Sequence, residues 1–109
     1  MTKMVDYEVS SGNVFADLEV DNPEEMLAKA QLALTILDAI EQRGLTQQQA
    51  AELLETDRTN ISKLKRGNEL RKFTFDRLLS WLTRLDRDVI LTVKRKSARR
   101  ESGKLRVAV

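Results

Sequence analysis

The sequence predicts a mainly α-helical domain of four helices, followed by a C-terminal β-strand or hairpin. Apolar residues recur at helical spacing through most of residues 22–88. Residues that cap or stop helices divide this span into four segments. After it, the run of β-branched and other apolar residues at 89–93 has the composition of a strand.

We divide the chain of 109 residues into three parts. Residues 1–21 form an N-terminal arm without a sustained period, and we expect Phe15 and Leu18 to anchor it on the core. Residues 22–88 form the helical domain, and residues 89–109 form a β segment that is a candidate for dimerisation. The length suits one domain with a modest core.

The first helix is predicted to begin at Pro23, with Asn22 as its N-cap. Glu24 and Glu25 place negative charge where the helix dipole favours it. Gly44 predicts the end of this helix. Its buried stripe is expected to contain Ala30, Ala33, Leu34, Leu37 and Ile40.

Two short helices follow. The first of them opens with a capping box formed by Thr46 and Gln49. The next starts at Thr56 or Asp57 and ends at Gly67. The residues of these two helices that are expected to face inward are Ala50, Leu53, Leu54, Ile61 and Leu64.

The fourth helix is predicted to start after Thr74, where Phe73 and Leu78 stand at the positions of a hydrophobic staple. Trp81 lies off its main apolar stripe. We expect Trp81 to pack over the first helix or the N-terminal arm, and a contact with a partner is the alternative. The stripe itself consists of Phe75, Leu78, Leu79, Leu82 and Leu85.

The predicted strand at 89–93 needs a partner, because an unpaired strand leaves its backbone polar groups unsatisfied. Residues 105–109, the N-terminal arm or the same strand of another subunit can supply that partner. The basic residues after the strand either track phosphates or protect an edge of the β segment. These residues are Lys94, Arg95, Lys96, Arg99 and Arg100.

The net charge of +2 conceals an asymmetric distribution. Residues 1–42 contain two basic and nine acidic residues, a net charge of −7. Residues 43–109 contain seventeen basic and eight acidic residues, a net charge of +9. This segregation indicates that the C-terminal part meets a polyanion. The acidic part faces either solvent or a basic partner.

The composition argues against an enzyme. The chain contains no His and no Cys, which removes the commonest general base, the thiol nucleophile and the usual transition-metal ligands. It also lacks a phosphate-binding glycine motif. We therefore expect neither a metal nor a cofactor. Because no apolar run can span a membrane and no signal peptide is recognisable, we expect a cytoplasmic protein.

Two short helices joined by about three residues have the geometry of a helix-turn-helix, whose second helix lies in the major groove of DNA. Residues 57–72 contain six basic and two acidic residues, which favours contact with a polyanion. Ala50 is small and lets the two helices approach each other closely.

Segments 45–54 and 57–67 resemble the helix-turn-helix of the Cro/repressor-type (XRE) family. Segments near both ends, such as 11–18 and 104–107, are similar to a subgroup that includes HigA-type antitoxins. The resemblance implies a lambda-repressor-like four-helix fold and a homodimer on a palindromic operator in double-stranded DNA. Glu55 departs from the family, which usually has a left-handed Gly there, so either strain is retained or the turn is reshaped.

Geometry and the resemblance together indicate the base-reading residues, which are Arg58, Thr59, Asn60 and Lys63. Arg58 can pair with a guanine and Asn60 with an adenine. The residues expected to contact phosphates are Gln47, Ser62, Lys65, Arg66, Arg71 and Lys72. As alternatives, Thr59 serves only the helix start and Lys65 is only a solvated charge.

These features predict a sequence-specific transcriptional repressor, and the resemblance implies the antitoxin of a type II toxin–antitoxin pair. Its acidic N-terminal part would bind a basic toxin of the RelE/HigB type, and the protein would repress its own operon. A free-standing XRE-type regulator without a toxin is the main alternative. A domain that binds only protein is a weaker one.

Overall fold

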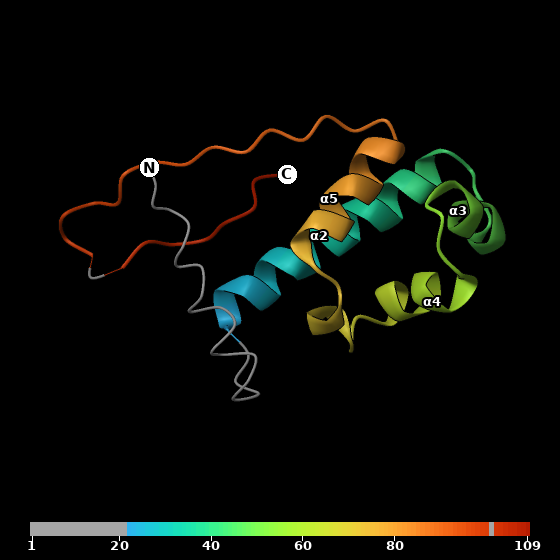
Figure 1. The fold of residues 1–109 in the computed structure, drawn as a ribbon, viewed down its shortest axis with the longest axis horizontal. Helices are drawn as coiled ribbons and strands as arrows, with labels where there is room; N and C mark the ends of the chain where they lie inside the picture. The colour runs from blue at the N-terminus through green and yellow to red at the C-terminus, as the bar shows by residue number, and fades with distance from the viewer. Residues whose placement is uncertain (1–21, 101) are drawn as a thin grey trace.

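The computed structural model describes residues 22–100 and 102–109, which form four α-helices and one 3-10 helix. The predicted anchors Phe15 and Leu18 lie outside the described residues. The four helices confirm the mainly α-helical part of the predicted fold (Figure 1). In chain order, the elements are α2 (Pro23–Gln42), α3 (Gln47–Leu53), α4 (Arg58–Arg66), η1 (Leu70–Lys72) and α5 (Phe75–Arg84).

Helix α2 begins as predicted. The Oδ1 atom of Asn22 accepts hydrogen bonds from the backbone N–H groups of Glu24 and Glu25, at 2.9 and 3.3 Å. Pro23 occupies the first helical position, where its missing N–H costs nothing. The helix ends at Gln42, shortly before Gly44 with its positive φ of 67°. These local signals therefore fix both ends of α2.

The buried face of α2 differs from the predicted stripe. Leu34 was expected to face inward, but it is 66% exposed. The helix is apolar over more than one face, and α5, η1 and α4 pack against the face that contains Ile36. Packing partners distant in sequence therefore selected the inward face. The side chains that α2 buries are those of Ala28, Lys29, Leu32, Ala33, Ile36, Ala39 and Ile40.

The two short helices have the predicted caps. The Thr46 hydroxyl accepts from the Gln49 N–H at 3.1 Å, and the Gln49 side chain accepts from the Thr46 N–H at 2.9 Å. At the start of α4, Asp57 Oδ1 accepts from the Asn60 N–H at 2.9 Å. Gly67 ends α4 with a φ of 76°. These contacts confirm the capping box and choose Asp57 over Thr56 as the N-cap of α4.

The turn between α3 and α4 keeps the left-handed conformation that the sequence left undecided. Glu55 has a φ of 57°, although it has a side chain that disfavours such a value. Its carboxylate lies 3.1 Å from Arg84 Nη1 of α5. This ion pair is exposed and therefore stabilises the turn only slightly. The strain is kept because the surrounding helices fix the turn.

We expect Glu55→Gly to be more stable than Glu55→Ala by about 1 kcal/mol in free energy of unfolding. Both variants lose the ion pair with Arg84, but only glycine relieves the strain of a positive φ. Urea denaturation followed by circular dichroism measures the difference. Equal stability of the two variants would show that the left-handed conformation costs nothing at this position.

The core lies between α2, α5 and the α3–α4 pair. Its largest fully buried side chains come from α2, α4, α5 and the C-cap of α5: Ile36, Ile61, Leu64, Leu78 and Leu85. Trp81 of α5 is only 3% exposed and packs edge-on against Phe73, with ring centroids 5.7 Å apart. Trp81 is thus a core residue rather than an exposed partner contact, and the ring that it packs against is that of Phe73.

The predicted C-terminal strand is not formed in this chain. No strand occurs in residues 22–100 or 102–109. Beyond α5 the backbone runs outward, turns, and returns towards the start of α2 (Figure 1). The Leu105 N–H donates to Glu24 Oε1 at 3.3 Å. The predicted strand at 89–93 was therefore wrong for the single chain, because this apolar run has no pairing partner among the described residues. Its Val93 is 96% exposed.

Candidate nucleic-acid interface

Helices α3 and α4 lie against each other at the end of the molecule opposite the C-terminal segment (Figure 1). Ala50 of α3 and Ile61 of α4 are buried, and both belong to the same core cluster. At the rim of this contact, the Ser62 hydroxyl donates to Gln47 Oε1 at 3.3 Å. Packing and a polar link therefore fix α4 on α3.

The outer face of α4 begins with two exposed residues. Arg58 and Thr59 occupy its first turn, and neither side chain has a hydrogen bond or ion pair within the described part of the chain. Asp57, the cap, is also exposed. The first turn of α4 is therefore open to a ligand from solvent.

A short capped helix, a tight turn and a second helix with an open polar face form one unit. The family model of the helix-turn-helix domain matches residues 14–94 of the chain. The chain belongs to the helix-turn-helix domain family. No curated protein and no solved structure gives a significant match. In helix-turn-helix proteins that bind DNA, the second helix of the motif enters the major groove, and α4 is the second helix of this motif.

The other two predicted base-reading residues of the helix-turn-helix have partners within the protein. Asn60 is half-buried, and its Nδ2 donates to Thr56 Oγ1 at 2.8 Å. The Nζ atom of Lys63 lies 3.8 Å from Glu69 Oε1. The structure therefore places Arg58 and Thr59 together at the open turn, while Asn60 and Lys63 sit closer to the body.

The residues predicted to contact phosphates fall into three groups. Gln47 and Ser62 bond each other across the helix-turn-helix at 3.3 Å. Lys65 and Arg66 are exposed on the last turn of α4. The remaining two, Arg71 and Lys72, lie exposed on η1. All six line α3, α4 or η1, but no single contact holds them as one cluster.

Glu69 is a residue that the sequence analysis overlooked. Its Oε1 atom lies 3.2 Å from Lys72 Nζ and 3.8 Å from Lys63 Nζ. The hydrogen bond from Lys72, together with the positive charges of Lys72, Lys63 and Arg66, lowers the pKa of Glu69. Glu69 therefore pairs with two of the cations that were predicted to contact DNA, Lys63 and Lys72. The i, i+3 spacing of Glu69 and Lys72 was the sequence signal that pointed to it.

Arg77 of α5 also supports the helix-turn-helix without having been predicted. Its guanidinium stacks over Trp81, 4.9 Å from the ring centroid, and donates to Thr56 Oγ1 at 3.2 Å. Thr56 in turn accepts from Asn60. Arg77 thus ties the start of α4 to the aromatic core. No local spacing in the sequence indicates this contact, because Arg77 and Thr56 are 21 residues apart.

Lys29 is the buried charged residue among the described residues, with 6% exposure. Its Nζ donates to the backbone carbonyl of Arg71 at 3.3 Å and lies 5.4 Å from the centroid of the Phe75 ring. A buried ammonium group is stable only where such acceptors compensate its lost hydration. Lys29 therefore fixes η1, the segment that carries Arg71 and Lys72, against α2.

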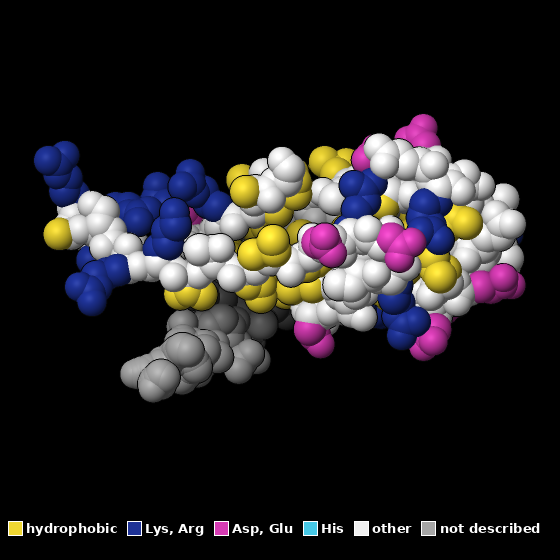
Figure 2. All heavy atoms as spheres, turned by 90° about the horizontal axis from the view of Figure 1, so that it is seen from above, with side chains coloured by type: hydrophobic (Ala, Val, Ile, Leu, Met, Phe, Trp, Pro, Cys, Tyr) yellow, Lys and Arg dark blue, Asp and Glu magenta, His cyan; other side chains and the backbone are white. Residues whose placement is uncertain are grey.

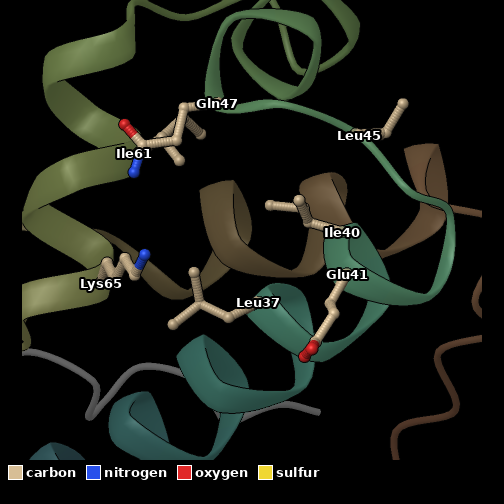
Figure 3. Close-up of a pocket in the computed structure, with 7 residues that line it drawn as sticks. All are labelled: Leu37, Ile40, Glu41, Leu45, Gln47, Ile61 and Lys65. Atoms are coloured by element: carbon tan, nitrogen blue, oxygen red, sulfur yellow. The ribbon is translucent and has the colours of Figure 1, made fainter.

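A pocket of about 450 Å³ opens between α2 and the helix-turn-helix (Figure 3). Gln47 and Lys65 stand at its edge, so it adjoins the predicted phosphate-contacting surface. Its only charged side chains are those of Glu41 and Lys65. The lining residues are Leu37, Ile40, Glu41, Leu45, Gln47, Ile61 and Lys65. Over residues 22–100 and 102–109, no group of carboxylates arranged to hold a metal ion is found.

None of the described helices is both long and apolar enough to cross a bilayer.

Proposed function

We propose that this protein is a sequence-specific transcriptional repressor of the Cro/repressor type that inserts α4 into the major groove. The observation that carries this proposal is the open first turn of α4, which presents Arg58 and Thr59 at the end of a helix braced by α3. Base edges in the major groove are reached by this part of a recognition helix.

The proposed reading chemistry follows from the side chains. The guanidinium of Arg58 matches the O6 and N7 acceptors of a guanine. Asn60 pairs with an adenine through its amide, one hydrogen of which is already donated to Thr56. Lys63, one turn further on, reaches the groove when it leaves Glu69. Thr59 contacts either a base edge or the thymine methyl group.

The proposed phosphate contacts flank the reading helix. Lys65 and Arg66 are exposed at its C-terminal end, and Arg71 and Lys72 are exposed on η1. Gln47 and Ser62 meet at the start of α3, where backbone N–H groups also favour an anion. Because repressors of this kind bind two half-sites about one helical turn apart, we propose a homodimer on a palindromic operator.

The double variant Arg58→Gln/Asn60→Ala tests the reading helix. We expect its preference for the selected operator over random duplex DNA to disappear, while weak, salt-sensitive binding remains. Sequence selection followed by a fluorescence-anisotropy titration measures both quantities. The matched control is Lys65→Gln/Arg66→Gln, which should weaken binding to all sequences about equally. If the first variant keeps its full sequence preference, α4 does not read bases.

We further propose that this repressor is the antitoxin of a type II toxin–antitoxin pair. Its net charge of −7 over residues 1–42 suits a basic toxin of the RelE/HigB type. On the outer face of α2, Leu27 and Leu34 are 61% and 66% exposed, and Asp38 lies one turn beyond Leu34. Apolar side chains beside acidic ones are typical of a surface that binds a basic protein.

Co-purification with the product of the neighbouring reading frame tests the antitoxin proposal. We expect a stable complex with a small basic ribonuclease-like protein, and Leu27→Asp/Leu34→Asp should weaken it. The double variant keeps the core intact, so it should bind operator DNA like the parent. Absence of a complex at micromolar concentration favours a free-standing regulator instead.

A further inference from the structure

The C-terminal segment carries a second concentration of positive charge. We call residues 94–106 the basic arm. Figure 2 shows its Lys and Arg side chains gathered at the end of the molecule that lies away from α3 and α4. The only acidic residue in this stretch is Glu101. Its seven basic residues are Lys94, Arg95, Lys96, Arg99, Arg100, Lys104 and Arg106.

The cations of the arm differ in how they are compensated from several arginines of the helical body. In the body, three arginines pair with carboxylates at 2.6–3.8 Å: Arg43 with Asp86, Arg84 with Glu55, and Arg87 with Asp38. Within the described part of the chain, none of the seven arm cations forms an ion pair. Clustered like charges repel each other, and a bound polyanion relieves that repulsion.

The tip of the arm has a defined turn. The Arg100 N–H donates to the carbonyl of Ser97 at 3.1 Å. The Lys96 ammonium group donates to the carbonyls of Ser97 and Arg100, at 3.4 and 2.9 Å. Through these bonds Lys96 closes the turn, and Arg99 remains exposed on the outer side of the turn. The arm therefore presents an ordered basic tip rather than scattered charges.

The spacing of the arm suits a phosphate backbone. An extended chain advances about 3.3 Å per residue, close to the rise of about 3.4 Å along the helix axis for each phosphate of one DNA strand. The longest dimension of the molecule is 46 Å, which exceeds the roughly 34 Å of one helical turn of DNA. A duplex that is held by α4 and runs along this axis reaches the end of the molecule that carries the arm.

We propose that the basic arm is a second, sequence-independent DNA-binding element that contacts phosphates beyond the base pairs read by α4. This inference rests on the proposed function, because α4 brings the duplex to the arm. Once α4 is bound, the arm binds intramolecularly at a high effective concentration. It adds affinity and salt dependence without altering which sequence is chosen.

The variant Lys94→Gln/Arg95→Gln/Arg99→Gln tests the arm, and it leaves Lys96 in place to hold the turn. Its matched control is Arg43→Gln/Arg84→Gln/Arg87→Gln, which removes the same number of positive charges from the body. Operator affinity is measured between 50 and 200 mM salt. The slope of log K against log salt should fall by about 2.7 in the arm variant only, since each phosphate contact contributes about 0.9. Over that range, the affinity of the parent should then drop about 40-fold more than that of the arm variant.

Sequence preference should be unchanged in the arm variant, and hydroxyl-radical footprinting should show loss of protection outside the half-site. Equal slopes for both triple variants, or no change in either, would overturn the proposal. Arm-dependent binding to anionic lipid vesicles with an unaltered DNA slope would also overturn it. Circular dichroism confirms that both variants fold.

Failure of the arm and failure of the proposed function give different results. If selection yields no preferred sequence, but the arm triple variant still lowers the salt slope on random duplex, the reading role of α4 is wrong and the arm is supported. If a sequence is selected and Arg58→Gln/Asn60→Ala abolishes the preference, but the arm variant keeps the parental slope, only the arm proposal fails.

Discussion

Replacement of Trp81 by alanine is expected to lower the free energy of unfolding by about 3–5 kcal/mol. The indole is 3% exposed, packs edge-on against Phe73 and supports the guanidinium of Arg77. Truncation leaves a cavity between α5 and η1 that rigid helices cannot fully close. Because small domains have only about 5–15 kcal/mol in total, this loss is large enough to populate the unfolded state.

Urea denaturation followed by circular dichroism measures this loss, since the variant lacks the tryptophan needed for fluorescence. The control is Trp81→Phe, which keeps an aromatic ring at the position and should cost far less than alanine. If Trp81→Ala is as stable as the parent, Trp81 does not support the core, and its role as a partner contact gains weight.

The second large effect is expected for Ala50→Leu at the contact between α3 and α4. Ala50 is 0% exposed and lies in the same core cluster as Ile61 and Leu64. Added methyl groups have no space there, so overpacking should cost about 1–3 kcal/mol and move α4 relative to α3. That movement should also break the link between Gln47 and Ser62 and remove sequence-specific DNA binding.

The matched control is Glu52→Leu, which introduces the same side chain on the solvent face of α3. This variant should retain both the stability of the parent and its operator preference. Thermal melting and anisotropy titrations measure the two properties separately. Retention of specific binding by Ala50→Leu at full affinity would contradict the view that close packing of α3 positions the reading helix.

The candidate interface was only partly predictable from the sequence. Arg58 and Thr59 stand at the open turn of α4, where local capping alone directs them. Asn60 and Lys63 were predicted for the same role, yet each has a partner in the protein. Thr56 lies only four residues before Asn60, so this contact is local to the start of α4. Glu69 lies beyond the end of α4, just before η1, so its contact with Lys63 depends on how the chain turns there.

The boundaries of the helices were determined by the sequence alone. Asn22, Thr46 and Asp57 cap their helices through bonds to residues two or three positions away, and Gly67 stops α4 by its own left-handed conformation. Such interactions are complete within a few residues. They therefore form in the same way whatever the rest of the chain does.

The tertiary structure decided between arrangements that the local sequence patterns did not distinguish. It exposed Leu34 and buried Ile36 on α2, buried Lys29 against the carbonyl of Arg71, and left the apolar run at 89–93 without a strand partner. Each outcome depends on which distant surface comes into contact. Burial and strand pairing depend on residues that are distant in sequence. The sequence alone therefore determined where the helices begin and end, including the caps of α4. Only packing determined which face of a helix is buried in the core.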